Sequence, residues 1–164
     1  MTLVFRVYGL AQTKGNMRAV PVKGRAFPAI TDANRSVAAW QQQIARAASE
    51  VINGLPYADR QLLVRGVRLS VAFYLPRPKK YQKAGCQVAH LTKPDTSKLL
   101  RAAEDALTGV AYLDDAQIVE LLATKSYAPV NHPPYVDIRV EATNGVFGEL
   151  APPAAPLPLL EALR

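Results

Sequence analysis

The chain has 164 residues, of which 49% are hydrophobic, and its 20 Lys and Arg against 13 Asp and Glu give a formal net charge of +7. A chain of this length buries one core but has little material for a second, and none of its apolar runs approaches the roughly 18 residues needed to cross a bilayer. A single cysteine, Cys86, excludes an internal disulfide, and His90 and His132 lack the paired spacing of a zinc site. We expect one domain in residues 1–148, a Pro-rich C-terminal tail in residues 149–164, and no contact with a membrane.

The first third of the chain predicts a strand, a basic segment and a helix. Residues 3–9 carry Val, Phe and Tyr in near alternation and are predicted to be a strand and not a signal peptide, so we expect a cytoplasmic protein. Residues 11–32 contain Gly, Pro and four basic side chains without a helical period, which indicates a basic loop or an irregular hairpin. A helix capped by Thr31 or Asp32 then continues to Gly54. Its predicted apolar stripe consists of Val37, Trp40, Ile44, Ala48 and Val51.

A second strand and a second helix follow. Residues 67–75 alternate with period two and are predicted to form the strand. Residues 76–85 cannot continue it, because proline blocks strand pairing and four positive charges crowd together, so we expect an exposed basic loop. The helix begins after Asp95, which can cap it, and ends at residues 108–109. Its predicted buried face consists of Leu99, Ala102, Ala103, Ala106 and Leu107.

The last regular segments are predicted to be two more strands. Residues 118–127 and 135–142 are rich in Val, Ile and Tyr, and a Pro-containing stretch separates them. The pattern favours a hairpin-like pair.

Charge is unevenly distributed along the chain. Residues 1–94 hold fifteen Lys and Arg against three acids, while residues 95–164 hold five against ten. A basic excess of this kind favours a polyanionic partner such as nucleic acid, because each cation placed on a phosphate releases counterions; solubility alone is the alternative explanation. The predicted phosphate-binding residues are Lys14, Arg18, Lys23, Arg25, Arg77, Lys79, Lys80 and Lys83.

Five of the thirteen carboxylates lie within residues 92–118. Carboxylates joined by a helix and a turn can converge at one end of that helix, where a cation must relieve their repulsion. Hard oxygen ligands, few histidines and a polyanionic partner together favour Mg²⁺ or Mn²⁺ and the hydrolysis of a nucleic-acid strand. Structural roles are the alternative: Asp95 could cap the helix, Glu104 and Asp105 could pair with Arg101, and Asp114 with Asp115 could hold a turn.

The run KPDTSKLLRAAEDALTGVAYLDDAQI resembles the signature of the RusA-type Holliday junction resolvases, in which K-P-D-x-D-N-L-x-K leads into a helix ending D-A-L, followed by D-D-x-Q-[IV]. The matching positions are 93–95, Leu99, Arg101, 105–109 and 114–118. The resemblance implies a single small α/β domain with a mixed β-sheet and two main helices. It also implies a homodimeric, metal-dependent endonuclease that cuts branched DNA without a small-molecule cofactor.

The same resemblance assigns roles to individual residues. It implies Asp95, Asp114 and Asp115 as metal ligands, with Asp115 the essential member of the pair. Asp95 and Asp115 are then catalytic together with Arg101, which stands where the family usually has a lysine. Two positions depart from the family pattern, because Ser97 replaces its second aspartate and Lys98 the asparagine that follows. The possible supporting residues are Ser97, Lys98, Glu104 and Asp105.

Three functions are therefore weighed. The first is a metal-dependent, structure-selective DNA endonuclease that resolves Holliday junctions or related branched DNA. The second is a branched-DNA-binding protein of the same fold that does not cut, which Ser97 motivates. The third is an RNA-binding module, and it is the weakest because the sequence has no aromatic RNP-like motif.

Overall fold

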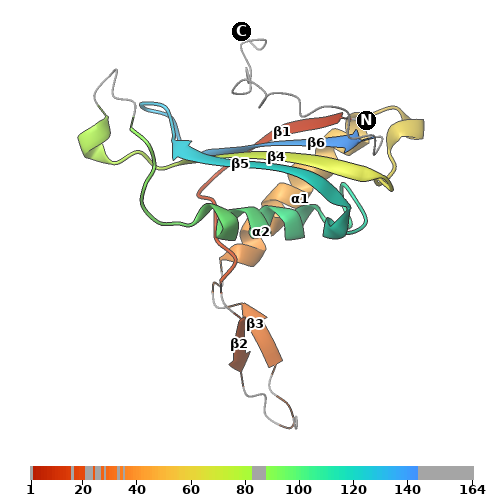
Figure 1. Cartoon of the computed structure of the whole chain (residues 1–164), viewed down its shortest axis with the longest axis horizontal. Coiled ribbons are helices and arrows are strands. Elements are labelled where there is room, and N and C mark those ends of the chain that lie inside the picture. The colour runs from red at the N-terminus through yellow and green to blue at the C-terminus, as the bar shows by residue number, and fades with distance from the viewer. Residues whose placement is uncertain are drawn as a thin grey trace.

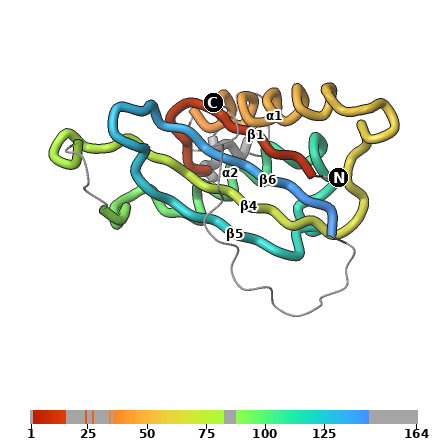
Figure 2. Tube along the Cα trace, turned by 90° about the horizontal axis from the view of Figure 1, so that it is seen from above, coloured from red at the N-terminus to blue at the C-terminus, as the bar shows by residue number. Residues whose placement is uncertain are grey.

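The fold is a mixed sheet with both helices on one face. The computed structural model describes residues 2–15, 17–20, 24, 27, 29–32, 34, 36–82 and 88–143, with the backbone alone for 17–20 and 29–32. Figure 1 shows the two helices on the same side of the sheet, and Figure 2 shows its strands side by side. In spatial order the strands are β1 (Thr2–Tyr8), β6 (Tyr135–Thr143), β4 (Gly66–Leu75) and β5 (Ile118–Tyr127), and the helices are α1 (Val37–Gly54) and α2 (Thr96–Leu107). Because β4 pairs antiparallel with β6 and parallel with β5, the predicted α/β fold with a mixed sheet is confirmed.

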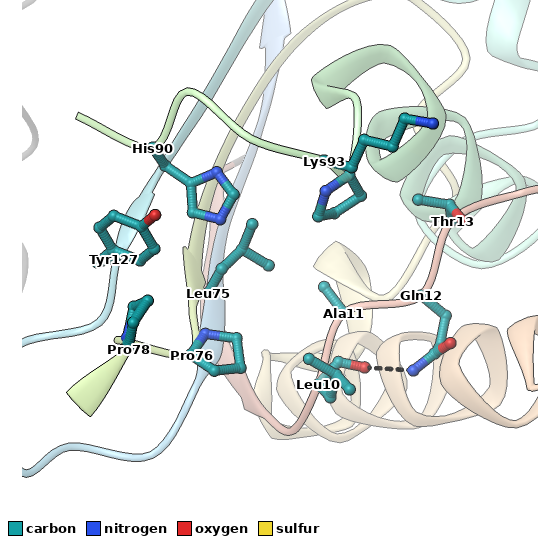
Figure 3. Close-up of a pocket in the computed structure, with 11 residues that line it drawn as sticks. Leu10, Ala11, Gln12, Thr13, Leu75, Pro76, Pro78, His90, Lys93 and Tyr127 are labelled. Atoms are coloured by element: carbon teal, nitrogen blue, oxygen red, sulfur yellow. Dashed lines mark hydrogen bonds between the residues drawn. The ribbon is translucent and has the colours of Figure 1, made fainter. Parts of the chain in front are cut away.

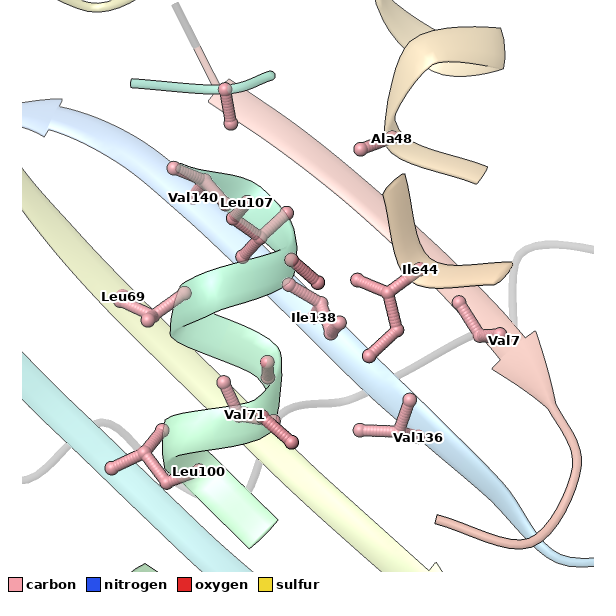
Figure 4. Packing of buried hydrophobic residues seen from close by; sticks show 14 of the residues in the cluster. Val7, Ile44, Ala48, Leu69, Val71, Leu100, Leu107, Val136, Ile138 and Val140 are labelled. Atoms are coloured by element: carbon pink, nitrogen blue, oxygen red, sulfur yellow. The ribbon is translucent and has the colours of Figure 1, made fainter. Parts of the chain in front are cut away.

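The core lies between the sheet and the helices, as Figure 4 shows. Alternation in the strands aims one set of side chains at the helices, and in β4 every second residue from Val67 to Leu75 is almost completely buried. Helix α1 buries its predicted stripe from Val37 to Ala48, and Val51 is half-buried. The whole predicted face of α2 is buried, together with Leu100. The alternation in the strands therefore accounts for the buried face of the sheet, and the spacing of three and four residues accounts for the buried faces of the two helices.

The segment before α1 forms the predicted hairpin, but α1 begins later than expected. Strands β2 (Met17–Val20) and β3 (Ala29–Asp32) pair antiparallel, and Figure 1 shows them projecting away from the main sheet. Thr31 and Asp32 belong to β3, so neither caps α1. The cap position is Ser36, whose side chain makes no capping hydrogen bond with the described residues. Strand pairing thus takes precedence over the cap preference of Thr and Asp.

The prediction that residues 118–127 and 135–142 pair with each other is wrong. Strand β4 lies between β5 and β6 and is hydrogen-bonded to both. The physical reason is the apolar content of β4: this strand is largely buried and is most stable with a neighbour on each side. Strand β5 has many exposed positions and forms an edge of the described sheet.

The sheet face opposite the helices carries an ion pair beneath tyrosines. Asp137 on β6 is 1% exposed, and both of its carboxylate oxygens accept hydrogen bonds from Arg6 on β1, at 2.6 and 2.9 Å. The Arg6 guanidinium also lies 4.0 Å from the centre of the Tyr135 ring, which stacks on Tyr74 at 4.3 Å between ring centres. The bidentate bond raises the pKa of Arg6 above its ordinary value. This cluster joins the three strands β1, β6 and β4.

The described part of the chain has no helix long and apolar enough to span a membrane. The predicted Pro-rich tail, residues 149–164, lies outside the described residues, so the boundary at residue 148 stays a prediction.

Candidate active site

Asp95 stands directly before α2 with its carboxylate open to solvent. Its side chain is about half exposed and makes no capping hydrogen bond with the described residues, although it occupies the cap position. The ammonium group of Lys98 lies 3.6 Å from one carboxylate oxygen. The backbone leading to Asp95 is tied to β5, because Lys125 Nζ donates to the carbonyl oxygens of Thr92 at 2.7 Å and Pro94 at 2.9 Å. The sheet therefore positions a carboxylate that is available to a ligand.

Asp114 and Asp115 follow the other end of α2 and differ in what they contact. Asp114 Oδ1 accepts a hydrogen bond from the Ala116 amide at 2.8 Å, and the Gln117 side chain accepts one from the Asp114 amide at 2.9 Å. This reciprocal capping box begins a short 3₁₀ helix, Asp115–Gln117. Asp114 thus holds a turn, as the structural alternative predicted. Asp115 is exposed, and its carboxylate is the more available of the pair.

Glu104 and Asp105 lie in the second half of α2 and also differ. Asp105 pairs with Lys14 and accepts a hydrogen bond from Gln41 at 3.2 Å, so it joins α2 to α1 and to the segment after β1. Burial raises the pKa of Glu104 above its ordinary value, the charges of Asp115 and Asp105 raise it further, and Arg101 lowers it. Asp115 is therefore an electrostatic neighbour of Glu104 at the carboxyl end of α2.

The structure does not bring Asp95 together with Asp114 and Asp115. The twelve residues of α2 separate the two ends by about 18 Å at about 1.5 Å per residue. The sheet gives the same result, because Lys125 beside the Asp95 end lies about 23 Å along β5 from Ile118, which follows the 3₁₀ helix. Among the described residues, no group of three or more His, Cys, Asp or Glu side chains is placed to hold a metal ion. Within the part of the chain that the structure describes, Asp95 therefore lies too far from Asp114 and Asp115 to share one metal ion with them.

Four of the eight predicted phosphate-binding side chains can be located. Lys79 and Lys80 are exposed on a 3₁₀ turn, Lys79–Tyr81, in the expected basic loop. Arg77 instead donates to the carbonyl oxygens of Ala128 and Tyr81, which fixes that loop to the end of the sheet. Lys14 is paired with Asp105, as described above. The remaining side chains, those of Arg18, Lys23, Arg25 and Lys83, lie outside the described residues.

A pocket of about 380 Å³ lies at the Asp95 end of α2, where β4 and β5 end (Figure 3). His90 and Tyr127 form one side of it, with 4.5 Å between their ring centres, and Lys93 lies on another side. His90 is 8% exposed, and its Nδ1 has no hydrogen-bond partner among the described residues. Sequence reasoning missed Lys93 and Lys125 as parts of the site. The only available signal was the position of Lys93 beside Pro94 and Asp95.

The chain is similar to known DNA-cutting enzymes over most of its length. Residues 11–141 match the model of a family described as endodeoxyribonuclease RusA, which is a class of DNA-cutting enzymes. Because the match covers most of the chain, the protein belongs to the RusA endodeoxyribonuclease family. Among curated proteins, the chain is similar to the uncharacterized protein YqaN of Bacillus subtilis (strain 168). The two are 28% identical over 132 residues, which cover 76% of this chain and 87% of that protein.

Proposed function

We propose that the protein is a homodimeric, structure-selective DNA endonuclease that needs Mg²⁺ or Mn²⁺ and hydrolyses phosphodiester bonds in Holliday junctions or related branched DNA. Family membership supports the nuclease class. The observation that carries the proposal is the availability of Asp95, an exposed carboxylate without a capping role that the sheet holds beside Lys98. Asp115 is the second proposed catalytic carboxylate.

The cations on the outward face of α2 suit a phosphodiester substrate. Lys98 and Arg101 are both exposed on this face. The proposed role of Arg101 is to donate hydrogen bonds to phosphate oxygens and to offset developing negative charge, because a guanidinium presents several N–H donors in a planar fork. Lys79 and Lys80 are proposed to contact phosphates farther from the cut, where they add affinity without sequence preference.

The direct test is an assay on a synthetic four-way junction. We expect cleavage with Mg²⁺ and none with EDTA, while a linear duplex of the same sequence stays intact. Binding of the junction, followed by gel shift, distinguishes the rival function. Retarded junctions that are never cut, with either Mg²⁺ or Mn²⁺, would favour the non-cleaving DNA-binding protein that Ser97 motivates. Equal cutting of duplex and junction would contradict structure selectivity.

Ser97 offers a gain-of-function prediction. It lies two residues after Asp95 at the start of α2, and it stands where the family pattern has an aspartate. We expect Ser97→Asp to lower the Mg²⁺ concentration needed for half-maximal cleavage, because a second carboxylate strengthens the attraction for a divalent cation at this end of the helix. The measurement is a Mg²⁺ titration of junction cleavage. Ser97→Asn is the matched control, and an equal shift with Asn would show that charge is not the cause.

A further inference from the structure

The pocket at the Asp95 end of α2 has walls that the fold itself holds in place. Its volume of about 380 Å³ lies near the lower end of the range for small-molecule sites. Leu75 and Tyr127, which end β4 and β5, are almost completely buried, and the Ala128 amide donates to the Leu75 carbonyl oxygen at 2.8 Å. The rest of the wall is largely apolar and rigid, because it includes the prolines Pro76, Pro78 and Pro94. Such walls suit a flat ring.

His90 is a buried polar side chain in the wall of this pocket. Its Nδ1 has no hydrogen-bond partner among the described residues. Figure 3 shows its ring nitrogens directed toward the space beside Leu75 and Lys93 and away from its backbone. Buried polar atoms in folded proteins nearly always have a partner, so an unpaired nitrogen beside a cavity indicates a ligand with a polar edge. A rotation about the soft χ2 bond brings either nitrogen to such an edge.

Gln12 offers a second set of hydrogen-bonding groups on the opposite side of the pocket (Figure 3). Its amide nitrogen donates to the Leu10 carbonyl oxygen at 3.1 Å, and its amide oxygen accepts from the Asn34 side chain at 3.3 Å. These bonds orient the amide, yet each uses only half of what its nitrogen or oxygen can offer. His90 and Gln12 can therefore both bind a flat ring with donors and acceptors along its edge. A nucleobase is such a ring.

The pocket lies beside the backbone that carries Asp95. Pro94 lines the pocket, and Lys125 Nζ donates to the Pro94 carbonyl oxygen at 2.9 Å, so the sheet fixes where Asp95 stands relative to the pocket. Lys93 is exposed, and Figure 3 shows its side chain extending out of the pocket, where a phosphate can reach the ammonium group. A nucleotide whose phosphate lies beside Lys93 can thus place its base in the pocket.

We propose that this pocket binds one nucleobase of the DNA strand at the cleavage site, taken out of the stack, with His90 and Gln12 hydrogen-bonded to its edge. This inference rests on the proposed endonuclease function and deepens it, because it names the contact that reads the strand. A base leaves the stack at least cost where its pairing is already interrupted, as at a branch point. The position of the cut then depends both on the branch and on the base that enters the pocket.

Cleavage of four-way junctions that differ in the base at each position next to the crossover tests this contact. At one position we expect wild type to cut the favoured base about tenfold faster than the least favoured one, the discrimination typical of paired hydrogen bonds to a base edge. An abasic nucleotide there should lower the rate by a similar factor. His90→Phe keeps a ring against Tyr127 but removes both nitrogens, so it is expected to lose most of the preference.

The matched control is His132→Phe, the same change at an exposed residue between β5 and β6 that does not line the pocket. It should keep the wild-type preference. Equal cutting of every junction by wild type, the abasic one included, would overturn the proposal. A preference that survives in His90→Phe would also overturn it, because the base would then be read elsewhere.

Photo-crosslinking gives a readout that needs no cleavage. Iodouracil is placed in turn at each position next to the crossover, and the junction is bound in EDTA and irradiated. We expect one position to crosslink to His90 or Tyr127, identified by mass spectrometry of the linked peptide. In a linear duplex the same base stays stacked, so its crosslink should be about tenfold weaker.

The crosslinks separate failure of this inference from failure of the proposed function. Junctions that bind but crosslink only outside the pocket would overturn the inference, whether or not they are cut. A chain that crosslinks through the pocket and never cuts would support the base contact and refute the endonuclease function.

Discussion

Junction cleavage is expected to fall by more than about a hundredfold in both Asp95→Asn and Asp115→Asn, because losing even a residue that only supports a metal ligand costs about 10- to 100-fold. Each substitution removes a negative charge and keeps the size of the side chain. Junction binding should be nearly unchanged, since Lys and Arg make the proposed phosphate contacts. The measurements are single-turnover cleavage and gel-shift titration of the same junction.

The control for these variants is Glu50→Gln. Glu50 is exposed on α1, where it pairs with Arg46, and it has no proposed part in cleavage. The same neutralisation there should leave both cleavage and binding at wild-type levels. Undiminished cleavage by Asp95→Asn or Asp115→Asn would remove that residue from the site. Loss of binding along with cleavage would assign it a role in DNA contact instead.

Asp137→Ala is expected to cause the largest loss of stability among single substitutions of polar residues described here. It leaves the Arg6 guanidinium beneath the tyrosines without its carboxylate partner. Breaking a buried ion pair on one side costs about 3–5 kcal/mol, and we expect the lower end because Arg6 is partly exposed. For a domain of this size, that cost lowers the melting temperature by roughly 10 °C.

A double variant separates charge from packing in this cluster. Arg6→Met combined with Asp137→Leu replaces both charges with apolar side chains, so no charge is left unpaired under the tyrosines. Thermal unfolding followed by circular dichroism should place its midpoint well above that of Asp137→Ala. If the single variant melts within about 2 °C of wild type, the ion pair contributes little to the fold.

Most of the correct predictions about the fold came from the local periodicity of apolar residues. The buried faces of both helices follow from spacings of three and four residues, and the strands follow from alternation. The pairing of strands is a long-range property, so the chain order of β5 and β6 suggested a contact that β4 prevents. The strand at the centre of a sheet is the one with the most apolar surface on both faces. A prediction that pairs strands adjacent in the sequence does not take this into account.

For the site, the sequence identified the carboxylates but not their arrangement. The length of α2, together with the contacts that hold Gln117 beside Leu63 and Lys125 beside Pro94, keeps Asp95 and Asp115 apart, although their closeness in sequence suggested convergence. The capping role of Asp114 was predictable as an alternative, because Asp and Gln three positions apart form a local motif. The clamp from Lys125 was not predictable, since it depends on where the far end of β5 meets the segment before α2.

The length of helix α2 also sets the distance between the two ends of the candidate site. With one candidate catalytic aspartate at each end, its number of turns sets the separation between the two groups, and each added turn increases that separation by about 5.4 Å. The hydrogen bond from Lys125 holds the segment before α2 against the sheet. The hydrogen bonds from Gln117 to the carbonyl oxygens of Leu63 and Arg65 hold the segment after α2 in place. If both aspartates take part in cleavage as proposed, the distance between them in one chain follows largely from the number of residues in this helix.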